Sequence, residues 1–233
     1  MDVDEGFIVG VYNYCDSWCA RCDLTSRCRA FANKAKHEAM ADPDLKRLGE
    51  MPPHPSDVRE PPKWMQEMLS ELNEDIEPLP DPPRPALPAS LRRVIAMAMA
   101  YCDHAWAALE SSRSSERPAD EPSTVILWFA PLIASKTRRA LNGFHEFDGE
   151  HSFPPDHERS AKVALLGIDR SMTAWSEARS IGRISAEESA RFIGELHHLC
   201  FSLEELIPQA RAFVRPGFDE PDQVRKLEAV DWS

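Results

Sequence analysis

Four cysteines lie close together near the N-terminus, and their type and spacing indicate chemistry more clearly than any other residues of the chain. Cys15, Cys19, Cys22 and Cys28 follow the pattern C-x3-C-x2-C-x5-C, and they are four of only six cysteines in 233 residues. Thiolates are ligands of zinc and of iron–sulfur clusters. In a reducing compartment such a tight group is typical of a metal site rather than of disulfide bonds. We therefore predict one metal or cluster site with these four ligands.

The spacing also predicts how the thiols are presented. On a helix the first three cysteines would stand at positions i, i+4 and i+7, and so would share one face. Cys28 would point away from that face unless the chain turns between Asp23 and Ser26. We predict such a turn, followed by a helix over residues 24–41 whose electropositive N-terminal end favours thiolates.

The identity of the metal is argued from spacing and charge. Zinc sites typically use paired C-x2-C motifs, with each sulfur about 2.3 Å from the ion, whereas this chain has one such pair, Cys19 and Cys22. An iron–sulfur cube has a larger envelope and suits a single compact group with uneven spacings. We predict an iron–sulfur cluster of the 4Fe-4S type, with zinc as the alternative and buried, metal-free thiols as the third reading. Basic residues that would offset the cluster's negative charge are Arg21, Arg27, Arg29, Lys34 and Lys36.

Part of the cysteine pattern resembles a known cluster site. The Cys19-x2-Cys22-x5-Cys28 triplet is similar to the last three ligands of the four-iron cluster in the endonuclease III family of DNA glycosylases. Only three residues separate Cys15 from the triplet here, whereas six do so in that family. The catalytic helix-hairpin-helix of those enzymes is not recognisable, so the resemblance implies a cluster and not their activity. The runs at 14–22 and 160–171 also resemble an uncharacterised bacterial protein family, which implies no function.

A second group of candidates consists of charged residues and histidines inside otherwise apolar helical stretches. An isolated buried charge is costly, so such residues must find partners or line a polar pocket. The chain has no nucleophile elbow, phosphate-binding glycine loop or dinucleotide fingerprint. A helical-bundle enzyme with a polar pocket is therefore kept as a further alternative, with no reaction specified. Its candidate residues are His104, Lys136, Arg139, Asp169, Arg170, Glu195 and His198.

The elements that must position these residues are predicted to be helices. Apolar residues recur at helical spacing over most of the chain after residue 89. Asn142 and Gly143 are predicted to end the second long helix, and Ser185 with Glu188 forms a capping-box signature that begins the fourth. Four long helices with modest connections predict an all-α fold, an antiparallel four-helix bundle over residues 89–215. The first three of these helices are expected at 91–110, 124–141 (with Pro131 inside) and 158–180.

The chain divides into four predicted parts. Residues 1–49 hold the cysteine site and short helices, and residues 50–88 form a proline-rich arm with one short helix. Eleven of the 20 prolines lie in that arm, and proline makes such a stretch extended and stiff. The bundle at 89–215 follows, and residues 216–233 form a polar tail.

Charge and composition restrict the partners. A formal net charge of -12 disfavours nucleic acid and anionic membrane surfaces as partners. No apolar run approaches the about 20 residues of a membrane span, and the acidic N-terminus does not look like a secretory signal, so we expect a cytoplasmic protein. The expected role is redox or structural use of the cluster within a larger assembly, with a protein partner or oligomer; a zinc-stabilised interaction module is the alternative. The sequence identifies no small-molecule ligand.

Overall fold

The computed structural model describes residues 6–8, 10–40, 86–111, 120–146 and 156–219. These residues form helices, turns and loops, without a β-strand, so the all-α prediction is confirmed. The chain separates into two compact units, Met1–Ala35 with Leu87–Ser233 and Lys36–Ala86. The first unit contains both the cysteine site and the bundle.

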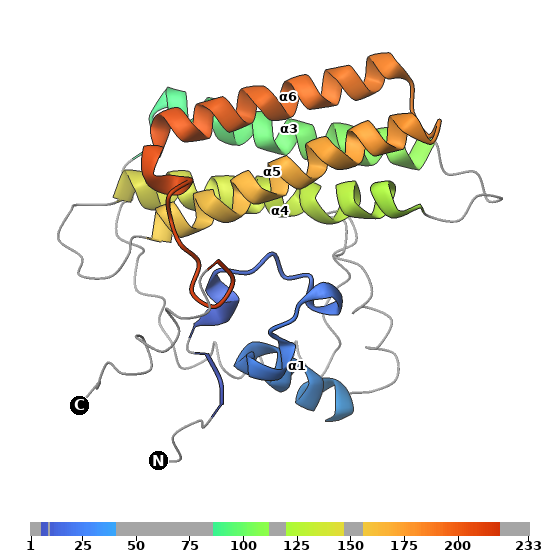
Figure 1. Ribbon diagram of the computed structural model, residues 1–233. Helices are drawn as coiled ribbons and strands as arrows, with labels where there is room; N and C mark the ends of the chain where they lie inside the picture. Colours follow the sequence, from blue (N-terminus) through green and yellow to red (C-terminus); the bar gives the residue numbers. More distant parts are fainter. Residues whose placement is uncertain (1–5, 9, 41–85, 112–119, 147–155, 220–233) are drawn as a thin grey trace, which may run out of the picture. The chain divides into compact units, whose positions relative to one another are not determined.

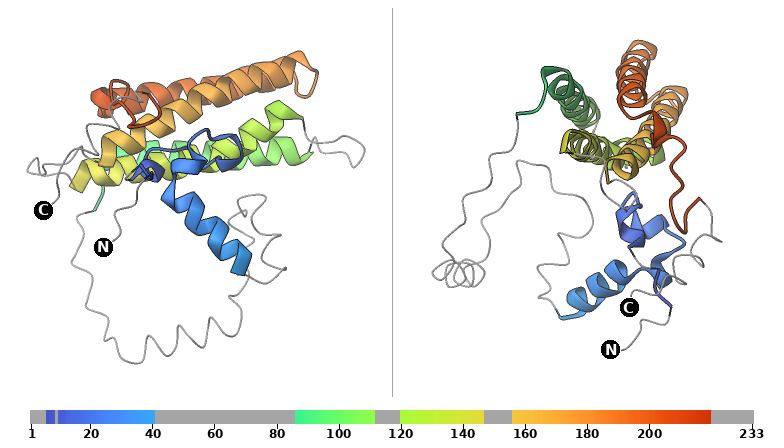
Figure 2. Two further views of the ribbon diagram at one scale, coloured as in Figure 1. Left: turned by 60° about the horizontal axis from the view of Figure 1, so that its bottom comes forward. Right: turned by 90° about the vertical axis from the view of Figure 1, so that its left-hand side faces the viewer.

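Four long helices make up the bundle, as predicted. They run up and down in turn, and each packs against the next while the last returns to the first (Figures 1 and 2). None of the described helices combines the length and apolarity needed to cross a membrane. The helices are α3 (Ala89–Ser111), α4 (Glu121–Glu146), α5 (Asp156–Ser180) and α6 (Ala186–Leu206).

The closest helix pair is α4 with α5, and a glycine allows it. A Cβ atom added to Gly167 of α5 would lie 3.1 Å from side-chain atoms of both Phe129 and Ile133 on α4. That is closer than most Cβ contacts in proteins, so a larger residue would force the Phe129 and Ile133 side chains to shift. Gly167 thereby permits close packing of α4 and α5, the helices that carry Trp128 and Arg170, which contact the cysteine segment.

The centre of the bundle is a group of buried aromatic side chains. Trp175 of α5 is fully buried and stacks on Phe192 of α6 with ring centroids 4.0 Å apart. Its indole Nε1 donates a hydrogen bond of 3.0 Å to the Tyr101 hydroxyl on α3. Burial raises the pKa of Tyr101 well above its ordinary value, so the hydroxyl remains neutral. Trp175 therefore joins three helices by packing and by one internal hydrogen bond.

The predicted end of the second long helix was wrong. α4 continues through Asn142 and Gly143 to Glu146. Both residues are partly buried, and an added Cβ on Gly143 would lie 3.4 Å from the Cβ of His157 near the start of α5. Packing of α5 against this turn keeps it helical, although Asn-Gly favours a helix end in isolation. Pro131 lies inside α4, as expected, without ending it.

The capping box at the start of α6 is confirmed. The Ser185 hydroxyl accepts a hydrogen bond of 3.1 Å from the Glu188 backbone N–H, and the Glu188 carboxylate accepts one of 3.1 Å from the Ser185 N–H. We expect Ser185→Ala to lower the free energy of unfolding by about 1 kcal/mol, measured by urea denaturation. Ser180→Ala, which removes an exposed hydroxyl at the end of α5, is the matched control and should change it less.

The capping box also makes this loss pH-dependent. Hydrogen bonds from the Ser185 backbone and side chain lower the pKa of Glu188 below its ordinary 4.5. A carboxyl group with a lowered pKa stabilises the fold above its ordinary pKa, and this contribution disappears as the pH falls through the lower, folded value. The stability difference between Ser185→Ala and the parent should therefore shrink in acid; an unchanged difference at low pH would contradict this account.

Several predicted elements lie outside the described residues. These are the short helices expected at 42–48 and 63–75, nearly all of the proline-rich arm, and the tail beyond residue 219. Within the described C-terminal part, a short 3-10 helix, Pro208–Ala210, follows α6, and the chain then runs back toward the cysteine site.

Candidate metal centre

All four cysteines line one small cavity, which we call the cysteine cavity. Its remaining walls are largely apolar. The thiols are 13 residues apart at most in sequence, yet they approach the cavity from different turns of chain. The prediction that they form a single group is therefore matched by their placement. The apolar wall residues include Val11, Trp18, Leu24, Phe31 and Phe218.

The thiols are presented by tight turns, and the predicted helical face was wrong. Ser17 has a left-handed backbone with a φ of 60°, Cys19 begins a three-residue 3-10 turn (Cys19–Arg21), and Cys22 is extended. A straight helix would place three thiols in a row along one face, whereas these turns wrap them around a common space. Local hydrogen bonds such as Cys22 N–H to the Cys19 carbonyl, 3.2 Å, hold each turn.

The turn predicted between Asp23 and Ser26 is confirmed, but the helix after it starts later than expected. A second 3-10 turn, Thr25–Arg27, precedes Cys28, and α1 runs over Arg29–Met40 rather than from residue 24. The Cys28 carbonyl accepts a hydrogen bond of 3.0 Å from Ala32 N–H, so Cys28 stands directly before the first helical turn. The extra turn brings Cys28 round to the other three cysteines. It also places Cys28 at the electropositive end of α1.

A small apolar cluster backs the cysteine cavity. Ile8 and Val11 are buried, and Leu24, Cys28 and Phe218 pack against them. Phe218 comes from the C-terminal part of the chain, so residues far apart in sequence close this side of the site. Apolar packing limits access of water to the sulfur atoms, which matters for any bound metal.

Trp18 inserts the cysteine segment (residues 14–28) into the bundle core. Its side chain is 9% exposed, stacks on Trp128 of α4 with centroids 4.9 Å apart, and meets the Phe129 ring edge-on. Stacked aromatic pairs contribute beyond the area that they bury. The cysteine segment is thus packed on the bundle through a side chain that lies next to Cys19.

Asp16 makes three further contacts that hold the same segment. Its carboxylate accepts hydrogen bonds from the Trp18 backbone N–H at 3.1 Å and from Arg170 of α5 at 2.5 Å. Its backbone carbonyl accepts a third, of 3.1 Å, from Trp128 Nε1 on α4. Arg21 pairs with Glu121 at the start of α4. Two helices of the bundle therefore determine where Cys15 and Cys19 stand.

The four thiols affect one another electrostatically. Burial is the main cause that raises the pKa of Cys19, and the neighbouring thiol Cys15 raises it further, while Lys34 lowers it. Burial also raises the pKa of Cys22, against a hydrogen bond to Cys22 from the backbone N–H of Leu24. Gathering several thiolates is unfavourable without a cation, so a metal that binds here must displace protons.

Lys136 of α4 belongs to the surroundings of Cys15 rather than to a separate pocket in the bundle. Burial lowers the pKa of Lys136, and so does the nearby Arg139, whereas the negative charge of Cys15 opposes both. The guanidinium of Arg159 lies over the Tyr14 ring, 5.6 Å from its centroid. Basic side chains from α4 and α5 thus add to Lys34 near the cysteine cavity.

The donor set fits a thiolate-bound metal, and the cavity size shows what binding would require. Among the residues that the structure describes, no three His, Cys, Asp or Glu side chains stand close enough to share one metal ion. The cavity measures about 20 Å³, room for about one water-sized body. A single zinc ion would require the thiols to draw together, and a cube would require the turns to open around it.

The other seven predicted residues are not gathered in one place. His104 of α3 contacts Glu195 of α6, with 3.3 Å between Nδ1 and Oε2, and Arg139 of α4 pairs with Asp156 of α5 at 2.6 Å. His198 is exposed on α6. Each pair joins neighbouring helices at the surface, which explains its charges without a catalytic pocket.

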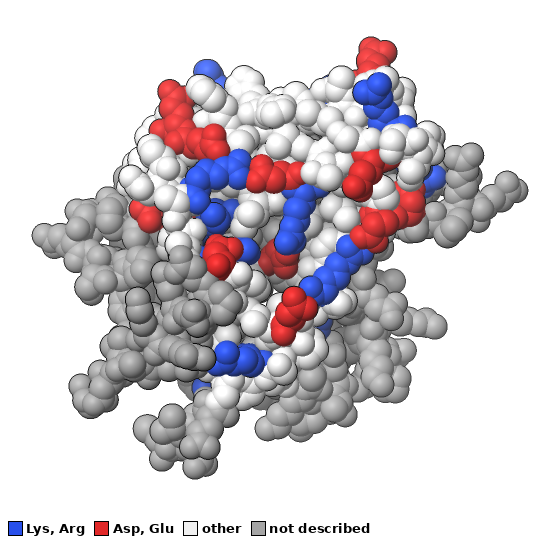
Figure 3. All heavy atoms as spheres, viewed as in Figure 1, with Lys and Arg blue, Asp and Glu red and all other residues white. Residues whose placement is uncertain are grey.

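Asp169 of α5 forms part of a charged network with residues that sequence reasoning missed. The Arg211 guanidinium bonds Asp169 at 2.5 Å, Glu204 of α6 at 2.5 Å and the Cys200 sulfur at 3.2 Å. On the face shown in Figure 3, basic and acidic side chains are interspersed in the same way. The network ties the chain after α6 to the bundle. Of the seven predicted residues, Arg170 and Lys136 reach the neighbourhood of the cysteines.

Comparison with protein-family models, with curated proteins and with solved structures yields no match for this chain. The resemblances drawn from the cysteine spacing and the short runs therefore stay predictions.

Proposed function

We propose that Cys15, Cys19, Cys22 and Cys28 hold an iron–sulfur cluster, of the 4Fe-4S type, which the protein uses in a redox or structural role within a larger assembly. The observation that carries this proposal is that all four thiols line one cavity whose other walls are mainly apolar. Buried cysteines that merely packed as small apolar side chains would have no reason to surround a common space.

Spacing and charge favour a cluster over zinc. The segment has one C-x2-C pair, whereas zinc sites typically use paired motifs of this kind. Four thiolates around a cluster leave a net negative charge. The basic residues Lys34 and Lys136 oppose this charge, because both interact electrostatically with the cysteines. Zinc remains the alternative that the same experiment tests.

The chain's own residues would tune and protect the site. Such a cluster supplies one-electron transfer when bound. The Leu24 N–H, directed at the Cys22 sulfur, stabilises negative charge there, and hydrogen bonds to ligand sulfurs raise the potential of such sites. Trp18, Phe31 and Phe218 line the cavity and exclude water.

Anaerobic purification followed by metal analysis tests the proposal. We expect a brown protein with broad absorbance near about 400 nm and about four irons and four sulfides per chain. A colourless protein with stoichiometric zinc would instead establish the interaction module, and one without metal would refute both. Reversible bleaching by dithionite would indicate a redox role, whereas a cluster that resists reduction but whose removal unfolds the protein would indicate a structural one.

A further inference from the structure

A larger cleft adjoins the cysteine cavity. It measures about 800 Å³ and lies between the cysteine segment, α4, α5 and the C-terminal turn at residues 215–218. This volume is within the range of small-molecule sites. We call it the arginine cleft, because Arg21, Arg27, Arg170 and Arg215 line it. The residues that line both spaces are Asp16, Trp18, Cys22, Leu24 and Phe218.

Three of these arginines lie over aromatic rings that also line the cleft. Each comes from a different part of the chain, so the arrangement is repeated rather than accidental. Stacking fixes the plane of each guanidinium. The N–H edges of two of them already hold carboxylates, because Arg21 bonds Glu121 and Arg215 bonds Asp219. The pairs, with the distance from the guanidinium carbon to the ring centroid, are Arg21 over Trp18 at 3.9 Å, Arg170 over Phe129 at 5.3 Å and Arg215 over Phe218 at 5.0 Å.

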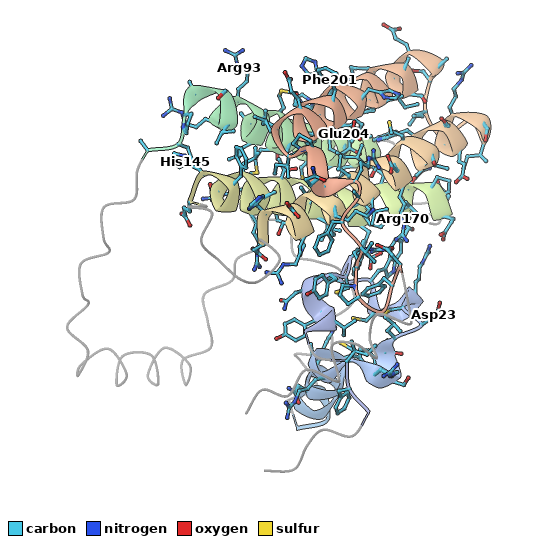
Figure 4. All side chains as sticks on the ribbon, turned by 60° about the vertical axis from the view of Figure 1, so that its left-hand side comes forward. Asp23, Arg93, His145, Arg170, Phe201 and Glu204 are labelled. Atoms are coloured by element: carbon cyan, nitrogen blue, oxygen red, sulfur yellow. The ribbon has the colours of Figure 1, made fainter. Side chains whose placement is uncertain are left out.

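Arg170 still has donors to offer. A guanidinium carries five N–H groups on three nitrogens, and the Asp16 carboxylate occupies only the Nη1 nitrogen of Arg170. The Arg170 side chain is 53% exposed. Figure 4 shows it extending from the bundle on the side that faces the cysteine segment, where Asp23 lies. The remaining N–H groups can therefore reach a ligand in the cleft.

The rest of the cleft suits an organic body. Leu24, Val125 and Phe218 are partly exposed and supply apolar surface, and Asp23 and Glu177 add negative charge to the lining. In a chain with a net charge of -12, general electrostatic attraction of anions is unfavourable. Any anion that binds must therefore be held by local, directed contacts.

We propose that the arginine cleft binds a small organic anion, with a carboxylate or phosphate held by the remaining N–H groups of Arg170 and an apolar body against the partly exposed apolar side chains of the lining. Because Cys22 lines both spaces, the ligand lies beside the metal centre. The binding itself does not depend on which metal the cysteines hold, and its failure would leave the cluster proposal standing.

Isothermal titration of the purified full-length chain, with its metal content measured, tests the proposal with three probes. The first probe, 1-naphthyl phosphate, has both the anionic group and the apolar ring system. Inorganic phosphate has only the anionic group, and 1-naphthol has only the ring system. We expect saturable one-to-one binding of naphthyl phosphate, about tenfold tighter than either fragment. Lack of saturable binding, or equal affinity for naphthol, would overturn the proposal.

Two variants locate the binding. Arg170→Gln should weaken naphthyl phosphate about tenfold, the usual loss for one charge-assisted hydrogen bond. Arg179→Gln, an exposed arginine on the same helix outside the cleft, should not. Because Arg170 also holds Asp16, a second variant avoids that contact: Glu177→Gln removes a carboxylate from the lining that has no side-chain partner among the described residues.

Glu177→Gln should tighten binding several-fold, since it removes repulsion between the carboxylate and the anion. Damage to the fold cannot produce a gain in affinity. Unchanged affinity in both Arg170→Gln and Glu177→Gln would place the ligand elsewhere and reject the cleft.

Discussion

Replacing Cys22 with Ser is expected to abolish metal binding. The Cys22 sulfur lines the cysteine cavity with the other three thiols and accepts a hydrogen bond from Leu24 N–H. A serine hydroxyl is a poor ligand for iron or zinc, and three thiolates cannot complete the site. Iron, sulfide and zinc per chain, measured after anaerobic purification, should fall to background whichever metal the parent holds.

Cys102→Ser is the matched control. Cys102 lies on α3, partly buried, and burial raises its pKa to about 11, so its thiol stays protonated. We expect this variant to keep the full metal content. Retention of metal by Cys22→Ser, or equal loss in both variants, would show that the cysteine cavity is not the metal site. Helical circular dichroism of Cys22→Ser checks that the bundle is still folded.

Trp175→Ala is expected to cause the largest loss of stability. The side chain is fully buried, stacks on Phe192 and donates to the Tyr101 hydroxyl. Truncation removes its packing and leaves a cavity between three helices, and such changes cost about 3–5 kcal/mol. The free energy of unfolding, from urea denaturation followed by circular dichroism, should fall by this amount.

Two further variants separate the causes. Phe201→Ala, at a side chain of α6 that is 67% exposed, should change the free energy of unfolding by less than about 0.5 kcal/mol. Trp175→Phe keeps most of the packing but loses the hydrogen bond. Its loss in the free energy of unfolding should lie between those of Trp175→Ala and Phe201→Ala. A cost for Trp175→Ala as small as that for Phe201→Ala would mean that this group is not the centre of the core.

The bundle could be predicted because its signals are local. The spacing of apolar residues locates all four long helices. Ser185 and Glu188 indicate the start of α6, because a capping box involves only four consecutive residues. The end of α4 was predicted wrongly at Asn142 and Gly143 because it depends on a contact that is not local in sequence. These residues favour a helix end, but packing of Gly143 against His157 of α5 overrides that preference.

The group of four cysteines was visible in the sequence, whereas its arrangement was not. Helical periodicity at Cys15, Cys19 and Cys22 suggested a common face, but the left-handed backbone of Ser17 and the extended Cys22 replace the helix with turns. Contacts such as Trp128 to Asp16 span 112 residues. Side-chain pairs across such separations produce no periodic pattern in the sequence. Neither the packing of the cysteine segment on the bundle nor the arginine cleft could therefore be predicted.

The threefold bonding of Asp16 would link the occupancy of the proposed metal centre to the stability of the whole protein. Asp16 follows Cys15 directly and is fastened to both α4 and α5. A cofactor that binds only the folded cysteine segment stabilises everything cooperatively joined to it. In newly synthesised chains, cofactor binding would then compete with proteolysis. The amount of protein in a cell would follow the supply of the cofactor.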